Sequence, residues 1–115
     1  MKVLTIEQSA TINTLESRGA MEGLPGTPTI ELAGLKVAIP QKEDINTGIF
    51  ECTMRTYRHI VQQAEIMHIL EGKGTFTPDG ESAIDFKAGD SLFFAENTQG
   101  QWDIETRMRK VYVIF

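Results

Sequence analysis

The sequence predicts an all-β domain, an antiparallel sandwich or barrel, over residues 28–115. Short apolar stretches rich in β-branched and aromatic residues follow one another from Gly48 to the end of the chain. Turn signals built from Gly, Asp and Pro separate these stretches. The chain has 115 residues, about one domain's worth, and shows no internal repeat. These observations together favour a single all-β domain.

The first part of the chain, residues 1–27, is expected to form an arm or a short helix outside the barrel. Three of the four prolines precede Gly48, and several glycines accompany them. Because Pro and Gly at this density break helices, regular structure is not favoured there. Residues 3–18 have only weak helical spacing of apolar side chains, so a short helix and an irregular arm both remain open.

The expected strands follow in order along the rest of the chain. Two short ones, residues 29–32 and 35–39, stand on either side of Gly34. The later ones are IFECTM (49–54), RTYRHIV (55–61), EIMHIL (65–70), GTFTP (74–78), SAIDF (82–86), SLFFA (91–95), QWDIE (101–105) and KVYVIF (110–115). Pro78-Asp79-Gly80 is the clearest hairpin turn, because Pro sets one φ angle and Gly supplies a positive one. A second hairpin turn is expected at residues 72–74.

Composition excludes several classes of protein. The apolar share of 41% and the charged share of 23% are ordinary for a globular domain and argue against disorder. The single cysteine, Cys52, cannot form an internal disulfide, so a reducing compartment is expected and the thiol is interpreted as an inert core residue. No stretch approaches the ~20 apolar residues of a membrane helix. The start of the chain lacks the pattern of a signal peptide. We therefore expect a cytoplasmic protein without a membrane partner.

The charge distribution argues against a nucleic-acid partner. The formal net charge is −5, and neither half of the chain offers a concentrated basic face. One basic cluster, Arg107, Arg109 and Lys110, is interpreted as a solvated entry to the last strand.

The stretch from His59 to Gly72, followed by AGD at 88–90, carries the most specific pattern. His59, Glu65 and Gly72 have the spacing of the first of two motifs in the cupin family, and Gly89 matches the opening glycine of the second. Residues 48–115 therefore resemble a cupin, which implies a double-stranded β-helix, or jelly roll. LEG, the DG turn, AGD, GQW and RKVY in this order further resemble the compact subgroup that includes ethanolamine-utilisation cupins.

The resemblance also bears on a cofactor. Metal-binding cupins use three His and one Glu, because imidazole and carboxylate suit a divalent cation. Here Val61 and Gly100 stand where the family has its second and third His, so only His59 and Glu65 remain. Two ligands hold a metal ion poorly. We therefore expect no cofactor, or at most a weakly bound divalent metal at His59 and Glu65.

Strand alternation predicts what faces the interior. If His59 points inward, so do Arg55, Tyr57 and Val61 on the same strand. Glu65, Met67 and Ile69 then face inward on the paired strand, and Trp102 faces inward two residues beyond Gly100. The candidate catalytic residues are His59 and Glu65, and the candidate ligand-binding residues are Arg55, Tyr57, Met67 and Trp102. Glu65 must find a partner, since an unpaired buried carboxylate is costly, and Arg55 or His59 is expected to supply it.

Three functions remain open. The first is a pocket that binds a small, anionic metabolite, with an eroded metal site. The second is a metal-independent or weakly metal-dependent enzyme of the isomerase, lyase or hydrolase type, in which His59 and Glu65 transfer a proton. The third is a structural component of a metabolic assembly. Self-association as a homodimer is also expected, through an outer face that carries Ile66, His68 and Leu70.

Overall fold

The computed structural model describes residues 3–21, 26 and 29–115, with the side chain of Val61 outside the description. Within these residues the chain forms ten strands and no helix. The strands are β1 (Glu16–Met21), β2 (Ile30–Val37), β3 (Asn46–Cys52), β4 (Arg55–Val61), β5 (Glu65–Glu71), β6 (Lys73–Pro78), β7 (Ile84–Lys87), β8 (Ser91–Phe94), β9 (Thr98–Ile104) and β10 (Met108–Ile114). Among the described residues there is no helix with the length and apolar character needed to cross a membrane.

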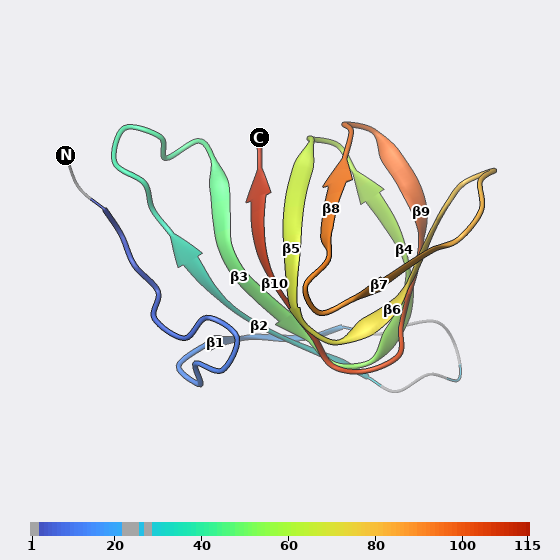
Figure 1. The fold of residues 1–115 in the computed structure, drawn as a ribbon, viewed down its shortest axis with the longest axis horizontal. Coiled ribbons are helices and arrows are strands. Elements are labelled where there is room, and N and C mark those ends of the chain that lie inside the picture. The colour runs from blue at the N-terminus through green and yellow to red at the C-terminus, as the bar shows by residue number, and fades with distance from the viewer. Residues whose placement is uncertain (1–2, 22–25, 27–28) are drawn as a thin grey trace.

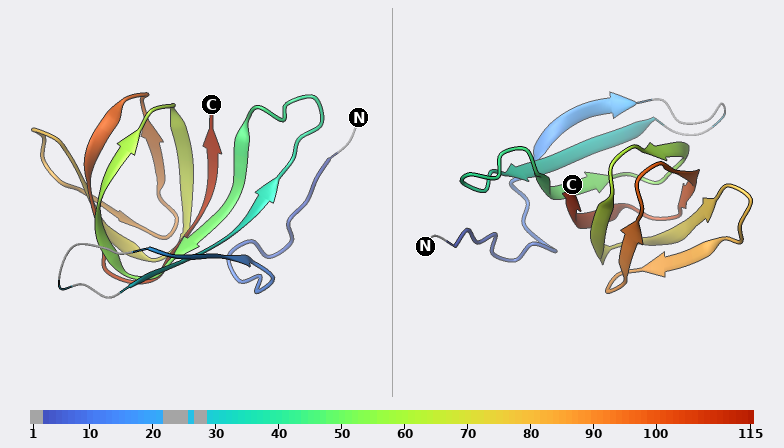
Figure 2. Two further views of the ribbon diagram at one scale, coloured as in Figure 1. Left: turned by 180° about the vertical axis from the view of Figure 1, so that it is seen from behind. Right: turned by 90° about the horizontal axis from the view of Figure 1, so that it is seen from above.

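The strands form two antiparallel sheets that face each other. One sheet has the order β1-β2-β3-β10-β5-β8 and the other β4-β9-β6-β7. In Figure 1 the two sheets rise as the walls of a cup, and β1 and β2 extend the larger sheet beyond β3. Figure 2 shows the same arrangement from behind and, in the view from above, the blue and teal β1–β2 pair along one side of the cup. Two facing antiparallel sheets with repeated crossovers are the jelly-roll arrangement, so the expected fold is confirmed.

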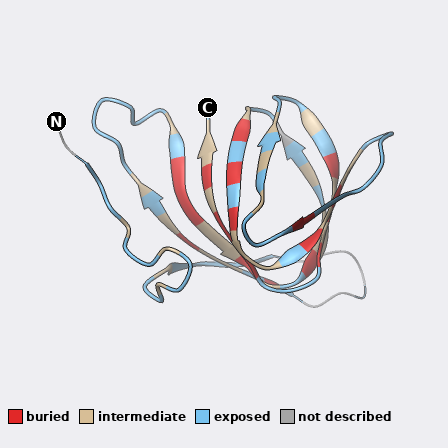
Figure 3. Cartoon of the chain, viewed as in Figure 1, coloured by how far each residue is buried: buried red, intermediate tan, exposed pale blue. Residues whose placement is uncertain are grey.

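Alternation along the strands puts apolar side chains between the sheets. In β5 the residues Glu65, Met67 and Ile69 are buried, while Ile66 and His68 are exposed. Figure 3 shows the same bands of buried and exposed residues along this strand. An aromatic cluster fills the interior next to β9, where the ring centroids of Phe76 and Trp102 are 4.8 Å apart. The core therefore lies between the sheets, below the mouth of the cup.

The register of the pairs fixes the positions that matter for the site. His59 on β4 lies opposite Gly100 on β9. Tyr112 and Lys110 on β10 lie opposite Met67 and Ile69 on β5, after a register shift that follows Arg109. Successive inward positions of β10 are thereby Lys110 and Tyr112, which face β4 across the interior.

Some expectations about the first third of the chain are corrected. The two strands expected at 29–32 and 35–39 are replaced by one strand, β2, that runs through Gly34, because Gly34 pairs both with Phe50 on β3 and with Glu16 on β1. Residues 3–15 are turns and irregular chain, so the helix is not formed, and residues 16–21 form β1. The division into an arm and a barrel at residue 28 stays a prediction.

The turn expected at residues 72–74 is not a hairpin. β5 and β6 on either side of it belong to different sheets, so the chain crosses from one sheet to the other at Gly72. The turn at Pro78-Asp79-Gly80 does join paired strands, β6 and β7. Gly80 has the positive φ of 76° that the turn chemistry predicted.

Two of the three residues in the basic cluster are not solvated, whereas the side chain of Arg107 is 58% exposed as expected. Arg109 and Lys110 are only 7% and 8% exposed. Arg109 donates to the backbone oxygens of Ser9 and Ile12 at 3.2 and 2.7 Å and pairs with Glu51 at 3.0 Å. It thus holds the N-terminal segment against the outer face of the larger sheet, whereas Lys110 points into the interior. Both side chains are buried because they pair with residues that are distant in the chain, and the local sequence does not reveal such partners.

Candidate functional site

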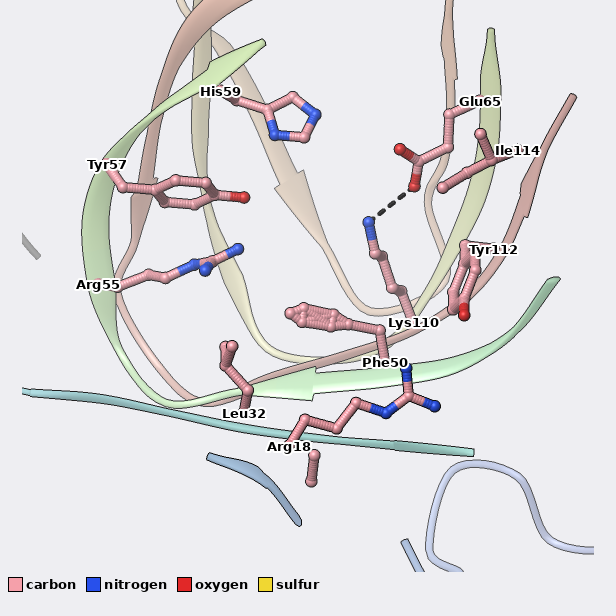
Figure 4. Close-up of a pocket in the computed structure, with 11 residues that line it drawn as sticks. Arg18, Leu32, Phe50, Arg55, Tyr57, His59, Glu65, Lys110, Tyr112 and Ile114 are labelled. Carbon is pink, nitrogen blue, oxygen red and sulfur yellow. Dashed lines mark hydrogen bonds and ion pairs between the residues drawn. The ribbon is translucent and has the colours of Figure 1, made fainter. Parts of the chain in front are cut away.

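An open cavity of about 370 Å³ lies between the two sheets. Its lining residues are Arg18, Leu32, Ala33, Phe50, Arg55, Tyr57, His59, Glu65, Lys110, Tyr112 and Ile114. Figure 4 shows polar side chains reaching into the cavity from β4 on one side and from β5 and β10 on the other. A smaller cavity of about 260 Å³ shares His59, Glu65 and Ile114 with it, so these residues lie at the junction of the two spaces.

Arg55, Tyr57 and His59 form the β4 wall because alternate residues of a strand share one face. The guanidinium of Arg55 lies 3.4 Å from the centroid of the Tyr57 ring. Arg55 is only 6% exposed, and its Nε has no hydrogen-bond partner in the described structure. Among the described residues, the hydrogen-bond partner of its Nη1 is the sulfur of Met21, at 3.5 Å. Arg55 is thus a buried cation held by aromatic stacking, with no carboxylate beside it among the described residues.

The opposite wall carries a buried ion pair. Lys110 Nζ donates to Glu65 Oε2 at 2.8 Å, and the two side chains are 10% and 4% exposed. Burial lowers the pKa of Lys110, and the carboxylate of Glu65 offsets part of that effect. The pair balances its own charge, so the excess positive charge of the cavity lies elsewhere.

Phe50 on β3 forms the floor between the two walls. Its ring centroid is 5.5 Å from the guanidinium carbon of Arg55 and 5.4 Å from Lys110 Nζ. The two cations therefore approach the same ring from opposite sides of the cavity. An anion above Phe50 lies within the field of both.

His59 is surrounded by aromatic rings. Its ring centroid is 5.7 Å from that of Trp102 and 5.9 Å from that of Tyr57. Nε2 is buried and has no partner among the described residues. Burial, together with the nearby charges of Lys110 and Arg55, lowers the pKa of His59 to about 4. The imidazole is therefore neutral near pH 7 and has a free nitrogen.

Arg18 adds a third cation at the cavity, from β1. Gly34 on the neighbouring strand makes room for it: a Cβ on Gly34 would lie 2.9 Å from Arg18 Nε and 2.9 Å from the carbonyl oxygen of Ile49. Among the described residues, the lining thus carries three cations, Arg18, Arg55 and Lys110, and one carboxylate, Glu65. This balance favours a negatively charged ligand.

The comparisons with known proteins agree with this architecture. Residues 40–112 match the family model described as the EutQ-like cupin domain. This chain belongs to that family. No curated protein sequence matches the chain.

Solved structures related to this cupin domain share its fold at low sequence identity. The EutQ protein of Clostridium difficile superposes with a TM-score of 0.65 at 18% identity, over 78% of this chain and 71% of that one. A putative ethanolamine utilization protein Q from Salmonella typhimurium gives 0.63 at 17% identity, over 90% and 98% of the two chains. A predicted oxalate decarboxylase from Thermotoga maritima gives 0.66 at 19%, over 96% and 98%.

The residues of this cupin domain do not fit the divalent metal of the metal-binding cupins. Val61 and Gly100 have no donor atom, and Glu65 is already paired with Lys110. A Cβ on Gly100 would lie 2.5 Å from both the Phe76 ring and the carbonyl oxygen of Thr77, so the place of a third histidine is filled. Within the described residues, no three His, Cys, Asp or Glu side chains lie close enough together to hold an ion.

The residues expected from the sequence divide into two groups. Arg55, Tyr57, His59 and Glu65 line the cavity of this cupin domain together. Met67 and Trp102, expected to contact a ligand, are 0% and 1% exposed and belong to the core behind the cavity wall.

The partner expected for Glu65 was Arg55 or His59, and this expectation is corrected, because Lys110 takes that place. Sequence reasoning missed Lys110, Arg18 and Phe50 as lining residues. For Lys110 a signal was available: it lies two residues before Tyr112 in an otherwise apolar last strand, on the same face. A lone lysine on the inward face of a central strand indicates a buried partner. For Arg18 the local sequence gives no such signal.

Cys52 is buried, as expected. Burial raises the pKa of its thiol, although Arg55 and Lys110 nearby act in the opposite direction. A protonated thiol is unreactive, in agreement with the interpretation of Cys52 as an inert core residue.

Proposed function

We propose that this cupin domain binds a small organic anion in the cavity between its sheets and acts as a binding or sensing module. The observation that carries the proposal is Arg55, a buried guanidinium whose Nε has no hydrogen-bond partner among the described residues. A buried charge is costly unless an opposite charge joins it. A carboxylate ligand would provide that charge and accept two parallel N–H bonds from the fork of the guanidinium.

The surroundings of Arg55 support a small ligand with some apolar surface. The volume of about 370 Å³ lies at the lower end of the range of small-molecule sites. Leu32, Phe50 and Tyr112 supply apolar walls. Arg18 supplies further positive charge near the same space, whereas the charge of Lys110 is balanced by Glu65. A short carboxylic acid or oxo acid fits this combination of size and charge.

A second candidate function is metal-independent proton transfer, and the state of His59 favours it. The imidazole is neutral near pH 7 and its buried Nε2 has no partner among the described residues, so it can accept a proton or a hydrogen bond from a bound acid. An anion beside Arg55 and Lys110 would offset the charges that lower the pKa of His59 and would thereby make it a stronger base. Glu65 would then act by holding Lys110 in place.

Calorimetric titration with a panel of short carboxylates tests the proposed binding. The panel contains formate, acetate, oxalate, pyruvate and succinate; oxalate is included because of the name of the Thermotoga relative. We expect one or more to bind with one-to-one stoichiometry. Arg55→Met should weaken that binding by about tenfold or more, the loss of a charge-assisted hydrogen bond.

Arg58→Met is the matched control. Arg58 lies on the same strand, but its side chain is half exposed and pairs with Asp79 at 2.6 Å away from the cavity. The control should bind like the parent. Equal affinity of the parent and Arg55→Met for every acid that binds would contradict the proposal, and so would a panel in which no acid binds. Turnover of a bound acid that is lost in His59→Gln would favour the second candidate.

A further inference from the structure

We infer that the ammonium group of Lys110 takes the place, beside Glu65, that a divalent cation takes in the metal-binding cupins. The protein would thus hold a cation of its own, the Lys110 ammonium, beside Glu65, which is the carboxylate of the metal-ligand motif. This inference concerns how the cavity is charged and does not depend on which anion binds there.

The contact between the two side chains is the first support. Lys110 Nζ lies 2.8 Å from Glu65 Oε2, and both side chains are removed from solvent. The same Nζ also approaches the sulfur of Met67 at 3.9 Å, which fixes it on the inner face of β5. Because one positive charge already neutralises Glu65, a divalent ion at this carboxylate would meet strong repulsion from the ammonium.

The charge and packing around His59 give independent support. Arg55, which lies on β4 with His59, is a second cation of the cavity besides Lys110. No described carboxylate balances its charge. Gly100 lies opposite His59, and the Phe76 ring fills the space that a side chain at position 100 would need. The chain therefore lacks the second and third histidines of the motif and carries positive charge where a metal ion would need negative charge.

The role of Lys110 predicts a specific result when a ligand is restored. Position 61 is two residues beyond His59 on β4, so a histidine there would share its face. Val61→His alone rebuilds two imidazoles and one carboxylate, three protein ligands of the kind that bind cobalt or zinc. If Lys110 blocks the site, Val61→His should remain a poor metal binder, and Val61→His/Lys110→Met should bind cobalt(II) at least about tenfold more tightly.

Cobalt(II) titration followed by NMR of the imidazole protons tests this prediction. The chain has only two histidines, and exposed His68, hydrogen-bonded to Ser91 at 2.8 Å, reports non-specific binding in the parent protein. In the double variant the His59 signals should broaden and shift at cobalt concentrations that leave His68 unchanged. Visible absorbance of cobalt gives the affinity in each variant.

Two outcomes would overturn the inference. One is Val61→His binding cobalt as tightly as the double variant, which would mean that the lysine does not exclude the ion. The other is a folded double variant, checked by circular dichroism, that gains no cobalt affinity. If Lys110→Met prevents folding, Lys110→Gln replaces it in the same comparison, since the amide can donate a hydrogen bond to Glu65 without a charge. Carboxylate binding by the parent is a separate measurement, so failure of this inference and failure of the proposed function can be told apart.

Discussion

The ammonium of Lys110 and the carboxylate of Glu65 meet 2.8 Å apart in the interior, although 45 residues separate them in the chain. β10 and β5 are neighbours in the larger sheet, and both side chains leave it on the inner face. A pair of this kind contributes little net stability when intact, but removal of one member leaves an uncompensated buried charge.

Lys110→Met should therefore destabilise the protein by about 3 kcal/mol in urea unfolding. Lys110→Met/Glu65→Gln should recover part of that loss, because no lone charge remains inside. Lys87→Met is the control: its contact with Asp90 is 3.9 Å long and its side chain is largely exposed, so a change below about 0.5 kcal/mol is expected. A Lys110→Met variant as stable as the parent would contradict the prediction that Glu65 is destabilising without its lysine partner.

The pKa of His59 should lie near 4 in the folded protein, compared with 6.5 for an unperturbed histidine. Between about pH 6.5 and 4 the unfolded chain then binds a proton at this position that the folded chain does not bind. Stability should therefore fall as the pH falls through this window, and His59→Gln should reduce that slope. NMR titration checks the pKa, and Arg55→Met should raise it, since Arg55 is one of its causes. An unchanged slope in His59→Gln would assign the pH dependence to other groups.

Gly100→Ala should destabilise the protein by about 2 kcal/mol, because the added methyl group overlaps a packed interior. Its Cβ would lie 2.5 Å from Phe76 Cζ and 2.5 Å from the carbonyl oxygen of Thr77. Gln99→Ala on the same strand is exposed and should change stability by no more than about 0.5 kcal/mol. Equal thermal stability of Gly100→Ala and the parent would show that Phe76 can move aside.

Self-association through the outer face of β5 and β8 is expected at micromolar concentration. Phe93 is 73% exposed on the edge strand β8 and pairs with Ile66, itself 38% exposed, on β5. Phe93→Asp should convert a dimer to a monomer in light scattering, because it places a charge in an apolar contact. Ile84→Asp, on the other sheet, is the control. A monomeric parent protein would contradict the expectation.

The strand positions after residue 48 followed from local information. β4 has its predicted bounds, and the predicted β5 and β8 differ from the observed ones by a single residue. Period-two alternation also predicted which residues of β5 face the core, since the side chains of a strand alternate whatever it pairs with. The motif spacing predicted a cupin. Together with strand alternation it also predicted that Arg55, Tyr57, His59 and Glu65 line one cavity, as they do.

Pairing between distant strands decided the rest. Lys110 and Arg109 are adjacent in a basic cluster, yet one enters the cavity and the other holds the N-terminal segment, because opposite faces of β10 meet different neighbours. Arg18 reaches the cavity only because β1 pairs beside Gly34. The sequence by itself determined the family and, after residue 48, the strands and their faces, which depend on neighbours along the chain. The charge partner of Glu65 and the cations of the cavity depend on which strands lie side by side and how they are staggered, and only the tertiary structure decided these.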